Sequence, residues 1–184
     1  QDTVALYEKQ ITHNGYTYDV GEIVTEASEK YGVDRSIILS LIMQESSGVN
    51  IKGYNPDGIL YPAWGITQIQ YVNTGSRTTT GYLADGSAYN VTIKTTNDIA
   101  TDERLQVDKA VDWSVAHFTG LLRKYNGNLL HALQAYNMGS EAVDFLIGAL
   151  GDEFYIQLIN DYPITYKTVL LPEALRREWT DQAR

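Results

Sequence analysis

Glu45 is the acidic residue whose position in this sequence most favours proton-transfer chemistry. It follows an apolar helical stretch, residues 37–43, and the Ser-Ser-Gly sequence at 46–48 predicts that the helix ends directly after it. Helical spacing places Glu45 on the same face as Ile38, Leu41 and Ile42. Loss of water and the negative end of the helix dipole both disfavour an anion there, so we expect its pKa to lie above the usual value of about 4.3. A carboxyl group that keeps its proton near neutral pH is suited to act as a general acid.

The composition narrows the class of partner. The chain has 184 residues, of which 43% are hydrophobic, and this is enough for one domain with a core. Its net charge of -9 argues against nucleic acid and anionic membranes as partners. No stretch approaches the roughly 20 apolar residues of a membrane span, so no membrane insertion is expected. Fourteen Tyr and three Trp suit a ligand held by hydrogen bonds and ring stacking, although ordinary packing explains most of the Tyr residues.

Local signals predict the elements that position Glu45. A helix is expected over residues 20–31, with Gly32 as its end, and Asp34 is a good N-cap for the Glu45 helix. Residues 48–60 read as irregular, and an Asp85-Gly86 hairpin is expected within a Thr- and Gly-rich stretch. A later helix is expected at 111–125, ending by Gly127. Two more are expected at 129–137, between Asn128 as cap and Gly139 as end, and at 140–150, with Ser140 as cap. A further helix should start at Asp152, and Pro163 and Pro172 should open two closing helices.

These elements predict a mostly α fold with a small β-hairpin excursion. Residues 1–18 read as a loose lead-in, and residues 19–184 as one domain that carries a hairpin insertion at about 73–98. The sequence has no cysteine, no His-Glu-x-x-His and no clustered His, so we expect neither a metal nor a cofactor.

Three short segments resemble one known family in the expected order. The sequence Gln-Glu-Ser-Ser-Gly at 44–48 resembles the Glu-Ser signature of the soluble lytic transglycosylase domain, which shares the goose-type lysozyme fold. Residues 63–69 are similar to its Gly-Leu-Met-Gln-Ile segment, and residues 135–139 to its Ala-Tyr-Asn-Ala-Gly segment. A weaker match at 165–170 resembles its closing helix. Thr67 departs from the family's usual Met, which implies a more polar groove floor.

The resemblance implies a peptidoglycan-cleaving enzyme that acts on the β-1,4 bond between N-acetylmuramic acid and N-acetylglucosamine. Glu45 would protonate the bridging oxygen, and the substrate-binding residues would be Ser46, Gln68, Tyr136, Asn137 and Tyr166. Some have equally good structural interpretations: Gln68 could cap the loop around Gly65, Tyr136 could pack in the core, and Asn137 suits a helix end. The implied partner is the glycan strand, and the implied location is extracytoplasmic: secreted, or associated with the cell wall or a virion. We expect a monomer or part of a larger wall-penetrating protein.

Three functions stay open at this level. A lytic transglycosylase would use Glu45 again as a base and would form a 1,6-anhydro ring. An inverting lysozyme would need a second carboxylate roughly 6.5–9.5 Å away, for which Asp57 is the first candidate and Asp85 the second. Turn Asp residues more often bond their own backbone, which favours the transglycosylase. The third possibility is a glycan-binding structural component of a phage tail or conjugation machine.

Overall fold

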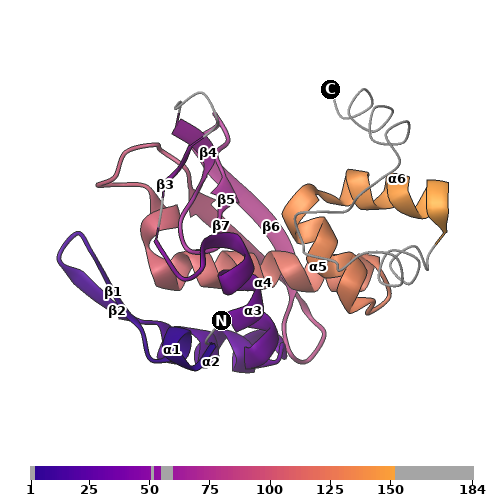
Figure 1. Cartoon of the computed structure of the whole chain (residues 1–184), viewed down its shortest axis with the longest axis horizontal. Coiled ribbons are helices and arrows are strands. Elements are labelled where there is room, and N and C mark those ends of the chain that lie inside the picture. Colours follow the sequence, from indigo (N-terminus) through magenta and orange to yellow (C-terminus); the bar gives the residue numbers. More distant parts are fainter. Residues whose placement is uncertain (1–2, 51, 55–59, 152–184) are drawn as a thin grey trace. The chain divides into compact units, whose positions relative to one another are not determined.

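The computed structural model describes residues 3–50, 52–54 and 60–151 (Figure 1). The chain divides into two compact units, residues 1–120 and residues 121–184. The described residues form six α-helices and three small antiparallel sheets, which confirms the prediction of a mostly α fold with a small β component. Every described helix is too short or too polar to cross a membrane.

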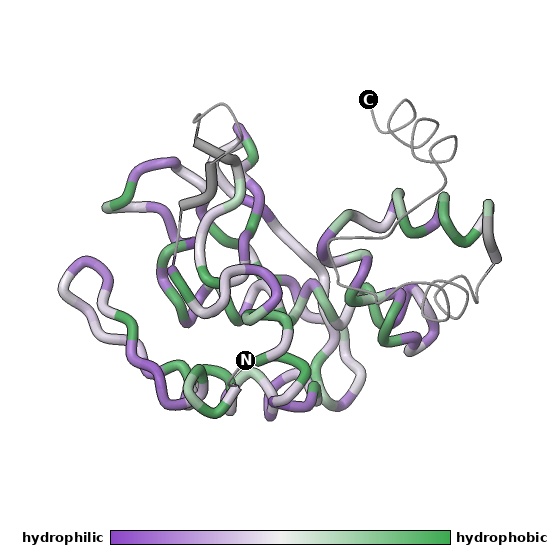
Figure 2. Tube along the Cα trace, viewed as in Figure 1, coloured by the Kyte–Doolittle hydropathy of each residue, from purple (hydrophilic) through white to green (hydrophobic). Residues whose placement is uncertain are grey.

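The chain begins with regular structure where the sequence predicted a loose lead-in. Helix α1 (Thr3–Tyr7) is followed by the antiparallel strands β1 (Gln10–His13) and β2 (Tyr16–Asp19). Asn14 and Gly15 join the strands with positive φ angles of 50° and 77°. An Asn-Gly pair is a strong hairpin signal, so the loose lead-in was a wrong prediction for these residues. Figure 2 shows that the far end of this hairpin is hydrophilic.

The two helices that follow begin and end as predicted. Helix α2 (Val20–Tyr31) ends at Gly32, whose φ of 66° is the left-handed conformation that glycine adopts readily. Helix α3 (Arg35–Ser46) begins after Asp34, whose carboxylate accepts a hydrogen bond from the backbone N–H of Ser36 at 2.9 Å. The predicted apolar face of α3 is buried, and its members Ile38, Leu41 and Ile42 are each at most 2% exposed.

A three-stranded sheet follows α3, although the sequence predicted irregular structure up to residue 60. Its strands are β3 (Lys52–Tyr54), β4 (Leu60–Trp64) and β5 (Ile69–Gln70), in that order across the sheet. Trp64 pairs with Ile69, so residues 65–68 form a hairpin loop between β4 and β5. We call this segment the 65–68 loop. The predicted turn that contains Asp57 lies outside the described residues.

The Asp85-Gly86 hairpin is confirmed, and it packs on a helix. Strands β6 (Ser76–Tyr82) and β7 (Ala88–Lys94) pair in antiparallel register. A short 3-10 helix, η1 (Glu103–Leu105), then leads into α4 (Val107–Lys124). A Cβ on Gly81 would lie 2.5 Å from the carbonyl oxygen of Ala116, so only glycine permits this approach of strand to helix. The backbone N–H of Tyr82 donates to the Thr119 hydroxyl at 2.9 Å, which fixes the hairpin to α4.

The second unit contains two helices that pack on each other, α5 (Leu129–Met138) and α6 (Ser140–Leu150). Asn128 caps α5 as predicted, since its side chain accepts from the N–H of His131. Ser140 does not cap α6: Gly139 occupies the cap position without a side-chain bond, and Ser140 is the first helical residue. The helices predicted after Asp152 lie outside the described residues.

Candidate active site

Glu45 lies in the last turn of α3 and is half-buried. The three residues before it on the same face are almost fully buried, so the carboxyl group lies at the edge of the hydrophobic interior and not at its centre. The helix ends one residue later, where Ser47 adopts a φ of 55° and its N–H bonds the carbonyl of Met43. Glu45 therefore lies at the carbonyl end of the helix, at the edge of the same face that is buried in the core.

Ser46 connects the end of α3 to the 65–68 loop. Its hydroxyl donates a hydrogen bond to the carbonyl oxygen of Ile66 at 2.7 Å and accepts one from the N–H of Gly48 at 3.1 Å. These contacts bring together two of the three segments that the sequence singled out. The hydroxyl of Ser46 therefore has a structural use, and its predicted contact with substrate stays a prediction.

The conformation of the 65–68 loop depends on Gly65 and Gln68. Gly65 has a φ of 90°, and a Cβ there would lie 2.0 Å from the carbonyl oxygen of Arg104. Gln68 is half-buried with a φ of 55°, and its Nε2 donates to the carbonyl oxygen of Gly65 at 2.9 Å. The capping interpretation of Gln68 is thus confirmed, while its contact with sugar stays a prediction.

Thr67 points into the protein. It is 1% exposed, its hydroxyl accepts from the Ser114 hydroxyl at 2.7 Å, and it donates to the carbonyl oxygen of Ala110 at 3.4 Å. The expectation that Thr67 makes a groove floor more polar is therefore wrong, because the hydroxyl is satisfied against α4. This pair of small hydroxyl side chains joins the 65–68 loop to the first half of that helix.

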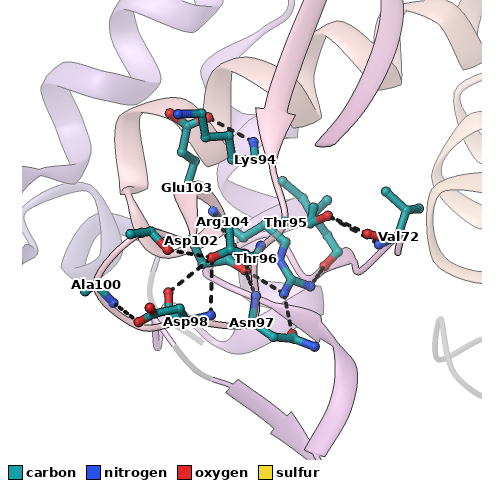
Figure 3. A network of polar contacts seen from close by, with 12 residues as sticks. Val72, Lys94, Thr95, Thr96, Asn97, Asp98, Ala100, Asp102, Glu103 and Arg104 are labelled. Carbon is teal, nitrogen blue, oxygen red and sulfur yellow. Dashed lines mark hydrogen bonds and ion pairs between the residues drawn. The ribbon is translucent and has the colours of Figure 1, made fainter. Parts of the chain in front are cut away.

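A buried ion pair between Asp102 and Arg104, part of the polar network in Figure 3, lies next to this loop, since the Arg104 backbone contacts Gly65. Both side chains are fully buried, and the guanidinium group donates to both carboxylate oxygens at 2.9 Å. Arg104 also donates to the carbonyl oxygen of Ile69 and to the Asn97 side chain, each at 3.0 Å. Arg104 thereby fixes the strand that follows the 65–68 loop.

The carboxylate of Asp102 is saturated with donors. Besides Arg104 it accepts from the backbone N–H groups of Thr96 and Asn97, both at 2.8 Å. Burial by itself would raise the pKa of Asp102, but these hydrogen bonds and the guanidinium charge outweigh burial and lower it. Sequence reasoning missed this pair. The available signal was an Asp-x-Arg spacing in a segment whose next residue, Leu105, is apolar and buried.

Asp85, the second candidate for a partner carboxylate, is bonded within its own turn. It is exposed in the hairpin turn, where Ser87 donates to it from both hydroxyl and backbone, and these bonds lower its pKa. The N–H of the adjacent residue Ala84 donates to the carbonyl oxygen of Lys30 in the last turn of α2 at 2.9 Å. The role of Asp85 as a second carboxylate stays a prediction.

The remaining predicted site residues belong to the second unit or lie outside the described residues. Tyr136 and Asn137 are half-buried in the last turn of α5, in the second unit, and Gly139 ends that helix as predicted. Asp57 and Tyr166 lie outside the described residues. Among the described residues, no group of three or more His, Asp or Glu side chains is arranged to hold a metal ion.

A comparison with protein families identifies the family to which the chain belongs. The profile of the family described as "Transglycosylase SLT domain" matches residues 22–153, which include most of α2 and all of α3 to α6, and therefore Glu45, the 65–68 loop and Tyr136. No solved structure matches the chain significantly. The match covers well over half of the sequence, so the chain belongs to the transglycosylase SLT domain family, whose domains act on peptidoglycan outside the cytoplasm as lytic transglycosylases.

Proposed function

We propose that this protein is a lytic transglycosylase in which Glu45 acts first as general acid and then as general base. Protonated Glu45 gives its proton to the oxygen between muramic acid C1 and the next sugar, and the C1–O bond breaks. Ionised Glu45 then takes the proton of the muramic C6 hydroxyl, whose oxygen bonds to C1. The products are a new sugar hydroxyl and a 1,6-anhydro end, and Glu45 regains its proton.

The observation that carries this proposal is the bond between Ser46 and Ile66. It holds the residue next to Glu45 against the 65–68 loop at 2.7 Å, so the two family-like segments of the first unit are in direct contact, as a shared site would require. The half-buried position of Glu45 at the carbonyl end of α3 supports the role, because both features disfavour the anion. Gln68 and the Tyr136–Asn137 pair are the proposed contacts to sugar, with Tyr166 as a further candidate.

Two other functions are the alternatives to a lytic transglycosylase. A muramidase would use a second carboxylate, for which Asp57 is the first candidate and Asp85 the second. A glycan-binding component of a wall-penetrating machine would bind peptidoglycan without cleaving it. The protein would act as a monomer, or as a domain of a larger protein that is secreted or associated with the cell wall or a virion.

The experiment is the digestion of purified peptidoglycan, followed by mass spectrometry of the released fragments. The transglycosylase gives anhydro ends, which are about 18 Da lighter than the reducing ends that a hydrolase gives. Glu45→Gln should lower the rate at least about 100-fold, whereas Glu29→Gln, an exposed neutral substitution on α2, should keep it. Asp57→Asn should only weaken the activity.

Each other result contradicts the proposal. Reducing ends, with equal losses in Glu45→Gln and Asp57→Asn, would assign an inverting hydrolase. An undigested sacculus that retains the wild-type protein would assign a binding module. Full activity of Glu45→Gln would remove Glu45 from the mechanism.

A further inference from the structure

The N-terminal element, residues 3–19, precedes the segment matched by the family profile, which starts at residue 22. It nevertheless packs closely on α2. A Cβ on Gly21 would lie 2.5 Å from the carbonyl oxygen of Tyr7, and the N–H of Val20 donates to the carbonyl of Lys9 at 3.0 Å. The backbone of Lys9 is therefore fixed at the start of α2, which leaves its side chain to reach another element.

That other element is the end of α3. The ammonium group of Lys9 donates a hydrogen bond to the carbonyl oxygen of Gly48 at 2.6 Å. Leu6, which is 3% exposed, packs on the same residue so closely that a Cβ on Gly48 would lie 2.7 Å from Leu6 Cδ1. Gly48 also has a φ of 81°, a left-handed conformation that glycine adopts readily.

The contact at Gly48 continues toward the proposed acid through a series of hydrogen bonds. The carbonyl of Gly48 accepts from Lys9, its N–H donates to the Ser46 hydroxyl, and that hydroxyl donates to Ile66. Glu45 directly precedes Ser46. A cation beside the last carbonyl groups of a helix is also favourable, because it offsets the negative end of the helix dipole.

We propose that Lys9 is a positioning residue that holds the end of α3, and with it Glu45, in the geometry that cleavage requires. This inference rests on the proposed role of Glu45. The N-terminal element thus acts as a brace for the site, supplied by residues that precede the matched family domain. A displacement of about 1 Å at a catalytic group can lower a rate about 100-fold, so a loosened helix end is expected to affect kcat more than substrate binding.

The test compares Lys9→Met, Lys9→Arg and Lys30→Met in the full chain. Lys9→Met keeps the aliphatic stem and removes the donor, whereas Lys9→Arg keeps a donor. Lys30→Met is the matched control, since it removes the same charge and breaks a lysine bond of 2.9 Å to Asp112, away from Gly48. At a temperature where all variants are folded, Lys9→Met should lower kcat about tenfold with KM changed less than twofold. Lys9→Arg should restore kcat to within threefold of wild type, and Lys30→Met should match wild type.

Hydrogen exchange measured by mass spectrometry gives a second readout that does not depend on activity. Peptides covering residues 43–50 should exchange at least about tenfold faster in Lys9→Met than in wild type, and should be unchanged in Lys30→Met. Unchanged exchange in this segment overturns the inference, as does a Lys9→Met enzyme with wild-type kcat. Failure of the wild-type protein to cleave peptidoglycan would instead overturn the proposed function, and the exchange measurement would still decide the role of Lys9.

Discussion

The Ser46 hydroxyl donates a hydrogen bond of 2.7 Å to the carbonyl oxygen of Ile66, and these residues are 20 positions apart in the sequence. The bond joins the end of α3, the helix that carries Glu45 in its last turn, to the loop between β4 and β5. It therefore links the segment that carries the proposed acid directly to the loop that contains Gln68.

Removal of this bond should lower activity more than stability. We expect Ser46→Ala to reduce the free energy of unfolding by about 1 kcal/mol, the usual worth of one such bond, and to reduce kcat about tenfold, because Glu45 loses its anchor. Ser40→Ala is the control, since the Ser40 hydroxyl bonds the Ser36 carbonyl within the same helix and so does not connect α3 to the 65–68 loop. Equal kcat values for the two variants, measured on purified peptidoglycan, would contradict the anchoring role.

The buried Asp102–Arg104 pair should be costly to break. Arg104→Met leaves a fully buried carboxylate without its cation, and we expect a loss of about 3–5 kcal/mol in unfolding free energy by urea titration. Lys124→Met removes one partner of the Lys124–Asp144 pair, whose side chains are 44% and 46% exposed, and should cost less than about 1 kcal/mol. Similar losses in the two variants would show that burial does not control the strength of the pair.

Gly65 should tolerate no larger residue. Gly65→Ala places a methyl group 2.0 Å from a backbone oxygen that cannot move cheaply, at a φ of 90°, and we expect a loss of more than about 3 kcal/mol together with loss of activity. Gly86→Ala has a similar φ of 85° but no atom within 4 Å, so it measures the conformational strain alone, about 1 kcal/mol. Thermal unfolding of both variants gives the comparison, and equal destabilisation would disprove the steric requirement.

His117 should make the fold sensitive to acid. Burial, and to a lesser extent the charge of Arg77, lower its pKa from 6.5 to about 4. Between pH 6.5 and 4 the His117 side chain is protonated in the unfolded chain but stays neutral in the folded chain. The stability that neutral His117 contributes to the fold is therefore complete above pH 6.5 and is lost as pH falls toward 4. The loss should reach about 3 kcal/mol.

The matched variant for this effect is His117→Gln, because glutamine can still bond the Thr79 hydroxyl that lies 2.9 Å from His117 Nδ1. Urea unfolding at pH 7, 5 and 4 should show a smaller decline for the variant than for wild type. Parallel declines in the two proteins would assign the acid sensitivity to other groups.

The sequence alone determined the features that depend on near neighbours. Asp34, Gly32, Asn128 and Gly139 predicted helix ends correctly, because a cap bonds backbone groups within a few residues of itself. The apolar face below Glu45 was equally predictable, since helical periodicity is local. The resemblance of three short segments identified the family for the same reason, because each segment is continuous in the chain.

Only the tertiary structure decided which distant groups meet. Lys9 reaches a carbonyl 39 residues away, and Arg104 reaches one 35 residues away. Such contacts depend on how the whole unit folds, and no spacing in the sequence encodes them. The same holds for Thr67, whose hydroxyl points toward α4 because Ser114 lies there to bond it. Local patterns specify helices and their ends, whereas the support of Glu45 arises from packing between segments that the sequence shows only as separate pieces.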